Sequence, residues 1–472
     1  MRAGASGSFA SRGERNTRYS AATPFDHETL RRRQIGRAMR AVESTATVLI
    51  LILISDAILP LFLHGGPNYP DLTPATKFER ASFWLSYAFT FAQLLVRPRQ
   101  ILRAAARNPF VLGVVIIAVL SIAWSDDPET SLRRAFALGM WTLFGYYLAS
   151  RYDTTELLQH LAIALGILAV LSLATGALLP DYGRESGFNG GAWRGVYTTK
   201  NVLGEMMLLA AVVFGSLARR ANRAKTPAVL GILLVVTLIV FARATAASLI
   251  VLLLVITIPI VLMFRRRAAL SAMICCCLLG FSAVGLVASV NEQTVLNVVG
   301  KDPTLTGRTV LWEAVIQRIE DRPVLGYGYG VFWEPTTASS ERVRAAVGWD
   351  APHAHNGILD TWLDLGLIGV LSLSAAYVLA LRRAWTGLRT RVGIEGVWAM
   401  TFLVMLFLGN TTESSISQSP FIWVIFVAVA CMRWPRYPSS EHSRGPDRRG
   451  ADRHSMDRLS LATQERALDQ TP

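Results

Sequence analysis

The sequence has few charged residues for its length. Asp, Glu, Lys and Arg make up 17% of the 472 residues, whereas a soluble protein usually carries about 25%. Near-continuous apolar runs recur along most of the chain, a pattern typical of a protein that crosses a membrane several times. The net charge of +14 does not predict nucleic-acid binding, because the basic residues stand in short clusters between apolar runs and there report membrane topology.

Cysteine is also scarce. All four cysteines lie inside apolar runs, namely Cys275, Cys276, Cys277 and Cys431. We therefore interpret them as small hydrophobic residues of helices rather than as a disulfide framework. No Cys-x-x-Cys or Cys/His ligand spacing occurs, which argues against a structural zinc site. The first forty residues lack an early hydrophobic core, so the sequence predicts no cleavable signal peptide.

The apolar runs divide the chain into about twelve predicted transmembrane helices. They lie near residues 45–64, 81–96, 109–124, 135–149, 157–179, 201–218, two within 228–264, 268–290, 357–381, 397–408 and 420–432. The predicted fold is therefore an all-α polytopic membrane protein with one large loop outside the membrane.

This division gives five parts. They are a disordered tail at 1–44, transmembrane helices 1–9 at 45–290, a large loop at 291–356, transmembrane helices 10–12 at 357–433, and a disordered tail at 434–472. Arginine-rich clusters recur in every second loop, as in residues 97–107 and 219–225. The positive-inside rule then places both termini in the cytoplasm and the large loop outside. The alternation requires a hairpin near Arg243.

The strongest candidate for chemistry is His355, followed by Asn356, just before the tenth predicted helix. An imidazole beside the positive end of a helix favours its neutral form, which a general base needs. His353 stands two residues earlier, and either histidine alone could be a plain surface residue. Two acidic residues follow within two helical turns, Asp360 and Asp364.

Several arginines are candidates for binding an anion. Arg194 precedes a helix start at which Asn201 is the predicted N-cap, and exposed N–H groups there favour a phosphate. Arg308 is predicted at the beginning of an amphipathic helix over 310–319 that lies at the outer membrane face. Arg243 is either at the membrane interface or functional, since a charge at depth is costly. For Arg194, an ordinary arginine reaching toward the interface is the alternative.

Two further motifs have structural interpretations. Residues 124–135 form a polar turn with Trp124 as an interfacial anchor and a helix capped at Thr130 or Ser131. The Gly-rich run at 326–330 does not predict a nucleotide-binding loop, because no strand precedes it. It predicts a tight loop with tyrosines at the membrane interface.

Taken together, these motifs resemble the bacterial O-antigen ligase and polymerase superfamily. The closest branch is similar to the exopolysaccharide production polymerases, and the resemblance spans about residues 110–430. The motifs that carry it are the Trp-Ser-x-x-Pro-x-x-Ser-Leu-Arg-Arg segment from 124, Lys200-Asn201-x-Leu203-Gly204, Thr304 to Thr309 with Trp312, His355-Asn356-Gly357-x-Leu359, and Asn410-x-Thr412-Glu413-Ser414.

The resemblance implies the fold of the membrane glycosyltransferase C class, in the bacterial inner membrane, with the large loop in the periplasm. It implies a glycosyltransferase that needs no metal and no cofactor and uses glycans carried on undecaprenyl pyrophosphate, which it joins to an acceptor glycan. His355 matches the family's catalytic histidine, Arg308 its Gly-Arg-Thr arginine, and Arg194 an upstream arginine that contacts pyrophosphate. Further residues that the matching motifs assign to substrate binding are Lys200, Asn201, Asn356 and Arg243. The family often has a Ser-Arg-Thr element before this span, whereas this chain has Arg243-Ala244-Thr245. The role of Arg243 is therefore left open.

The motifs leave three functions open, namely a polymerase, a ligase and a transporter. The element at 410–414 and the form of residues 304–309 favour a polymerase over an O-antigen ligase that transfers glycan to a lipid A core. A polysaccharide-lipid transporter is less favoured, because charges within predicted spans are few and no internal repeat occurs. The sugar, its linkage, the oligomeric state and the binding of a chain-length regulator are not determined by the sequence.

Overall fold

The computed structural model describes residues 26–55, 57, 77–185, 191–218, 225–242, 305–335, 337–389, 393–411 and 413–433. These residues form helices and no β-strand. In chain order the helices are α1 (Asp26–Leu53), α3 (Lys77–Val96), α4 (Pro98–Ala105), α5 (Pro109–Leu120), the 3-10 helix η1 (Ser121–Trp124), α6 (Pro128–Arg151), α7 (Thr154–Leu178), α8 (Pro180–Gly183), α9 (Lys200–Ala218), α10 (Lys225–Ala242), α14 (Leu305–Asp321), α15 (Ala338–Val347), α16 (Gly357–Arg389), α17 (Gly393–Asn410), α18 (Ser415–Gln418) and α19 (Pro420–Cys431).

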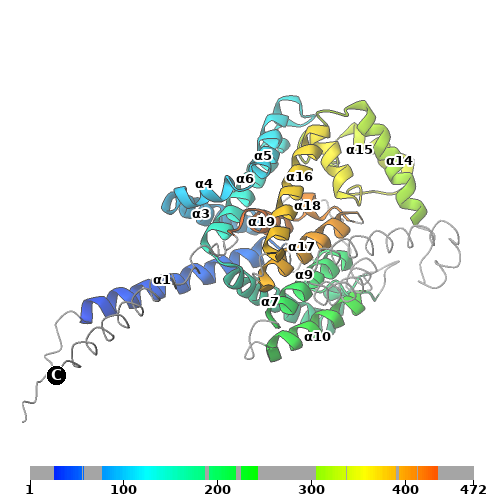
Figure 1. Cartoon of the computed structure of the whole chain (residues 1–472). Helices are drawn as coiled ribbons and strands as arrows, with labels where there is room; N and C mark the ends of the chain where they lie inside the picture. The colour runs from blue at the N-terminus through cyan, green and yellow to red at the C-terminus, as the bar shows by residue number, and fades with distance from the viewer. Residues whose placement is uncertain are drawn as a thin grey trace, which may run out of the picture.

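Helix α19 lies at the centre of the bundle (Figure 1). Its residues from Phe421 to Cys431 are all buried, as expected for a helix that is apolar on every side. Helices α6 and α16 pack against it. The contact with α6 is close at Gly145, where an added Cβ would lie 2.6 Å from the Cβ of Val427. A second group, α7, α9 and α10, joins this core through the packing of α9 on α17.

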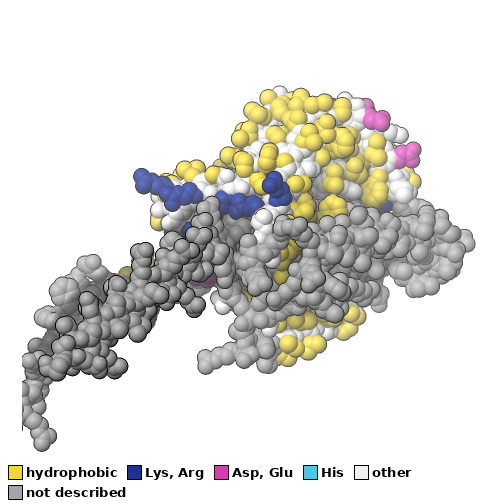
Figure 2. Space-filling view, in the orientation of Figure 1, with side chains coloured by type: hydrophobic (Ala, Val, Ile, Leu, Met, Phe, Trp, Pro, Cys, Tyr) yellow, Lys and Arg dark blue, Asp and Glu magenta, His cyan; other side chains and the backbone are white. Residues whose placement is uncertain are grey.

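Three described helices are long and apolar enough to cross a membrane: α7, α9 and α16. Helix α4 together with α5 and η1 adds a fourth if this pair, bent by 94°, is one span, and shorter apolar helices occur within α3, α10, α17 and α19. Apolar side chains also cover much of the surface that the described residues present in Figure 2. The helices suggest an integral membrane protein. The number of spans and the large loop stay predictions, and residues 243–304 lie outside the described part.

Helix α1 begins earlier than the predicted end of the disordered tail. The tail is predicted over 1–44, but α1 is helical from Asp26, which corrects the end of that segment. Its residue Glu43 forms ion pairs with Arg97 and with Arg151, the latter at 3.1 Å. Composition does not reveal these contacts, because they join α1 to the ends of α3 and α6.

The predicted amphipathic helix is present as α14, but its apolar face has a different partner. Leu311, Val315 and Ile319 are buried in a small core with residues of α15 and the following loops. The apolar stripe of α14 therefore packs against other residues of the loop region. The sequence predicts that it contacts the membrane instead. Helix α14 begins at Leu305, so Arg308 lies in its first turn.

The glycine-rich loop at 326–330 is docked into the fold. Helix α16 is broken at Gly366, whose φ is 64°, and the N–H of Tyr327 donates to the carbonyl of Leu363 just before the break. Tyr327 is only 3% exposed, so the predicted interfacial position is wrong for this tyrosine. The loop thus fastens the large-loop region to α16.

The turn at 124–127 is the other partner of this loop. Trp124 donates from Nε1 to the carbonyl of Leu325 over 3.0 Å. Ser125 lies close to Gly328, because a Cβ added to Gly328 would be 2.3 Å from the Oγ of Ser125. The N-cap of α6 is Asp127, which lies before both predicted caps, Thr130 and Ser131. The turn that contains Trp124 therefore holds the loop, and the anchoring of Trp124 at a membrane interface stays a prediction.

Candidate functional site

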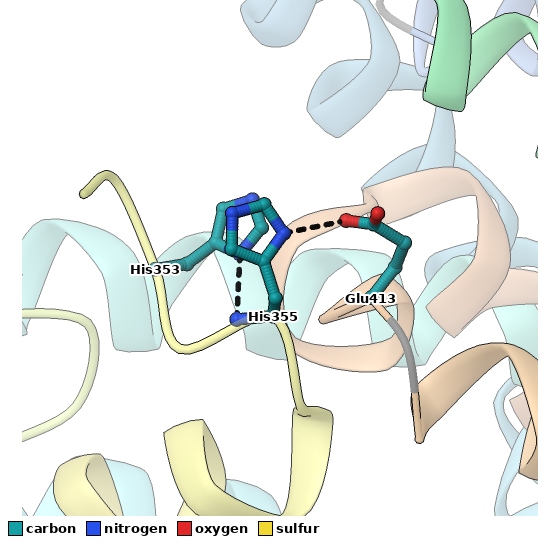
Figure 3. Close-up of side chains that lie close together, drawn as sticks. All are labelled: His353, His355 and Glu413. Atoms are coloured by element: carbon teal, nitrogen blue, oxygen red, sulfur yellow. Dashed lines mark hydrogen bonds and ion pairs between the residues drawn. The ribbon is translucent and has the colours of Figure 1, made fainter. Parts of the chain in front are cut away.

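Glu413, in the loop between α17 and α18, gathers side chains from three other segments. Its Oε2 lies 3.0 Å from Nδ1 of His355. Its Oε1 accepts from Nη2 of Arg308 at 3.1 Å and from Nδ2 of Asn201 at 3.0 Å. His353 lies beside His355, as Figure 3 shows. We refer to these five residues as the Glu413 cluster.

The carboxylate of Glu413 is held in its ionised form. Burial by itself raises its pKa, but the hydrogen bond from His355 and the charges of His355 and Arg308 outweigh burial and hold the pKa below its ordinary value. The side chain is 21% exposed, so the cluster is neither sealed nor fully open to water. An ionised, partly buried carboxylate is a strong acceptor for neighbouring donors.

This carboxylate fixes the tautomer of His355. An ionised carboxylate only accepts hydrogen bonds, so Nδ1 of His355 carries the hydrogen in the bond to Glu413. Nε2 then holds the lone pair and can receive a proton. A carboxylate that orients an imidazole and stabilises its charged form is the arrangement of general-base histidines in hydrolases. The geometry therefore equips His355 for proton transfer.

The loop that carries His355 is docked on the segment that carries Glu413. The N–H of Asn356 donates to Oγ of Ser414 over 3.1 Å. Oδ1 of Asn356 accepts from the N–H groups of Ile358 and Leu359 at 3.0 and 3.3 Å, which caps the beginning of α16. The backbone of Asn356 thus joins the two segments and its side chain caps α16, whereas its contact with substrate stays a prediction.

Asn201 and Lys200 stand at the beginning of α9. The helix starts at Lys200, so the predicted N-cap, Asn201, lies in the first turn and its side chain reaches Glu413 instead. The N–H of Lys200 donates to Oε1 of Glu185 over 2.6 Å. Through Asn201, the first turn of α9 is therefore in contact with Glu413.

The other two predicted anion contacts are not brought into the cluster by the described contacts. Nε of Arg194 donates to the carbonyl of Tyr182 over 2.7 Å, and its N–H donates to that of Gly183. Both partners lie in α8. Arg243 falls in a segment outside the described residues, so its role stays a prediction.

Glu413 is the residue that the site analysis of the sequence missed. The element at 410–414 indicates a polymerase, but by itself it assigns no role to Glu413. A signal was present, because an acidic residue stands in a short polar interval between two apolar runs, the same context that singled out His355. What the sequence did not show was that two polar intervals 58 positions apart meet.

The donor types of the cluster raise the question of a metal ion. His353, His355 and Glu413 offer ligand atoms within 4.8 Å of one another. Nδ1 of His355 is already bonded to Glu413, Nδ1 of His353 accepts from the N–H of His355, and Arg308 adds a positive charge beside the carboxylate. These bonds fit proton transfer better than a bound cation. The absence of a metal from the reaction stays a prediction.

Comparison with known proteins points to one family. The family model described as O-antigen ligase matches residues 228–374, a range that contains Arg308 and His355. The chain is also 25% identical over 316 residues to the exopolysaccharide production protein ExoQ of Rhizobium meliloti (strain 1021), covering 65% of this chain and 72% of that protein. Both matches support the O-antigen ligase and ExoQ-like family, the resemblance that the motifs indicated.

Proposed function

We propose that the protein is an inner-membrane polysaccharide polymerase. It joins oligosaccharide repeats carried on undecaprenyl pyrophosphate at the periplasmic face, in exopolysaccharide or O-antigen biosynthesis. The similarity to ExoQ and to the O-antigen ligase family supports polysaccharide biosynthesis in a membrane. The apolar helices agree with a bilayer as the surrounding medium.

The observation that carries this proposal is the bond between His355 and Glu413. In the proposed reaction, Nε2 of His355 takes the proton of an acceptor hydroxyl as its oxygen attacks the anomeric carbon of the donor sugar. The bond from that carbon to the pyrophosphate oxygen breaks, and undecaprenyl pyrophosphate leaves with both electrons. Glu413 stabilises the imidazolium that forms on His355.

The leaving pyrophosphate needs positive charge, since it gains negative charge as the bond breaks. Arg308 is the proposed partner inside the cluster, because its guanidinium is only partly covered, with 30% of its side chain exposed. Arg194, Lys200 and Arg243 are proposed contacts for the rest of the donor. Asn201 is proposed to help hold Glu413 and thereby His355. No nucleotide or other cofactor is proposed, because the pyrophosphate is itself an activated leaving group.

The second candidate is an O-antigen ligase, which transfers a finished glycan to a lipid A core. The name of the matching family model favours it, whereas ExoQ is named for exopolysaccharide production. The forms of residues 304–309 and 410–414 favour the polymerase. Both functions use the same donor carrier and the same base. The acceptor distinguishes them, and partners such as a chain-length regulator belong to the polymerase proposal.

The test compares cells that make the wild-type protein, His355→Ala or Arg342→Ala. Arg342 is an exposed residue of α15 and serves as the control. Membrane abundance is first shown to be equal by immunoblotting. Lipid-linked saccharides and secreted glycan are then separated by size and compared. For a polymerase, we expect His355→Ala to accumulate single lipid-linked repeats and to lose long polymer, while Arg342→Ala behaves like the wild type.

Two other results would change the conclusion. Long lipid-linked polymer that is made but never attached to its final acceptor would identify a ligase. Unchanged glycans in His355→Ala would remove this residue from the mechanism and favour a polysaccharide-lipid transporter.

A further inference from the structure

The backbone of His355 adopts a conformation that residues with side chains usually avoid. Its φ is 50°, and no other non-glycine residue in the described ranges has a positive φ. Strain of this kind persists only when neighbouring groups hold it. The N–H of His355 donates to Nδ1 of His353 over 3.1 Å. A side-chain acceptor for the N–H two residues later is the bond of an Asx turn, here made by an imidazole.

The backbone on either side of His355 is fixed by other elements. The N–H of Ala354 donates to Oδ1 of Asp360 in α16 over 3.0 Å. The N–H of Asn356 donates to Oγ of Ser414 over 3.1 Å. The N–H of His355 itself has the imidazole two residues earlier as its acceptor. Three successive N–H groups are thus held by side chains, and the middle one is held locally.

The bond to the backbone fixes the protonation state of His353. An N–H group only donates, so Nδ1 of His353 carries the lone pair and its hydrogen is on Nε2. Burial, followed by the charges of His355 and Arg308, lowers the pKa of His353 to about 4, against the opposing charge of Glu413. His353 is therefore neutral at neutral pH.

The two imidazoles differ in which one can carry a proton. Their ring centroids lie 4.0 Å apart with an interplanar angle of 55°, and two groups this close do not both become cations readily. Among the contacts of the described residues, it is His355 whose ring bonds to the carboxylate of Glu413. A proton that enters the pair is therefore stabilised on His355, beside a neutral ring.

We propose that His353 is a positioning residue, whose Nδ1 holds the strained turn of His355 and whose neutral ring leaves the proton to that residue. This inference rests on the proposed function, in which Nε2 of His355 removes the proton of the acceptor hydroxyl. His353 acts through His355, so its own contact with the substrate is not needed.

Three variants separate the parts of this role. His353→Asn keeps an oxygen near the place of Nδ1 and can form the Asx turn. His353→Gln places its amide near Nε2 and loses the local acceptor. His353→Phe keeps a ring of similar size without any acceptor. If the hydrogen bond to the backbone is what matters, Asn rescues the function and the other two do not.

The measurement uses full-length protein in proteoliposomes. The donor is the lipid-linked saccharide extracted from a strain that lacks this protein. We expect His353→Asn to keep kcat within about threefold of the wild type, and His353→Gln and His353→Phe to lose about 10- to 100-fold in kcat with KM little changed, because a base displaced by about 1 Å loses about that much. Equal thermal stability of the purified variants is the control for folding.

Several results would overturn the inference. Activity kept by Gln and lost by Asn would show that Nε2–H contacts the substrate directly. Three variants as active as the wild type, or three equally inactive ones, would show that the backbone hydrogen bond does not matter. Should Gln and Phe fail to accumulate in the membrane, Asn alone decides, and a loss above about tenfold, or about 1.4 kcal/mol, contradicts the inference. His355→Ala separates the two proposals, because its full activity would reject the proposed function itself.

Discussion

Glu413 is bonded to three side chains from separate segments, so its charge is central to the site. Glu413→Gln keeps the size of the side chain but removes the charge that fixes Nδ1–H of His355. We expect kcat to fall by up to about 10⁴-fold, the loss seen when the orienting carboxylate of a catalytic histidine becomes an amide. The measurement is the rate of glycan transfer by purified protein.

The matched control for Glu413→Gln is Glu341→Gln in α15. Glu341 is exposed, so the same chemical change there should leave kcat unchanged. A Glu413→Gln protein that works at half the wild-type rate or better would show that His355 does not depend on this carboxylate.

The protonation of His353 predicts how stability changes with pH. The pKa of His353 falls from the ordinary 6.5 to about 4 in the folded protein, so between these values the unfolded chain binds more protons than the folded one. Stability therefore falls as the pH falls through this window. We expect the apparent Tm in detergent to drop less in His353→Asn than in the wild type between about pH 7 and about pH 4.5. Parallel curves would contradict the predicted neutrality of His353.

At the scale of elements, the break in α16 depends on Gly366. Its φ is +64°, and an added Cβ would lie 2.1 Å from the carbonyl oxygen of Val324. We expect Gly366→Ala to undock the loop at 326–330 and to destabilise the protein by at least about 1–3 kcal/mol, the cost of a strained backbone position. The measurement is a lower apparent Tm together with faster proteolysis of the loop.

Gly215 in α9 is the control for this substitution. A Cβ there would meet nothing within 4 Å, and alanine is the better residue inside a helix. We expect Gly215→Ala to keep or slightly raise the apparent Tm. Equal effects of the two alanines would show that the docking of the loop does not depend on close approach at Gly366.

The sequence predicted those elements that depend on local signals. The tenth predicted helix begins at Gly357, as α16 does, and the sixth begins near Asn201, one residue after the start of α9. Hydropathy and capping act over a few residues, so they are visible in one stretch of chain.

Contacts between distant stretches were not predictable in the same way. The sequence predicts His355 and Arg308 individually as site residues. It does not predict Glu413, which joins them, because nothing in one polar interval specifies which other interval it meets. The same holds for Tyr327, whose partner is the break in α16. A glycine-rich run indicates a turn without indicating where the turn is docked.

At the scale of the whole molecule, charge is distributed unevenly. On the face drawn in Figure 2, basic side chains gather around α4, and acidic ones lie beside α14. The predicted topology places α4 in the cytoplasm and α15 outside. We expect Arg342→Cys to react with a membrane-impermeant maleimide in intact cells whose outer membrane is permeable, and Arg103→Cys to react only after lysis.

These two substitutions are matched, since both replace an exposed arginine. The described native cysteine, Cys431, is buried and so gives little background. Labelling of Arg103→Cys alone in intact cells would invert the topology and place the Glu413 cluster at the cytoplasmic face, where the proposed reaction does not occur.

Asn201 and Glu413 are 212 positions apart, and Glu413 precedes the last described helix, α19. A chain made from its N-terminus therefore carries Arg308 and His355 before Glu413 has been synthesised. The Glu413 cluster is complete only after residue 413 has been added. Under the proposed function, a ribosome that stalls before residue 413 therefore leaves a product that cannot transfer lipid-linked sugar.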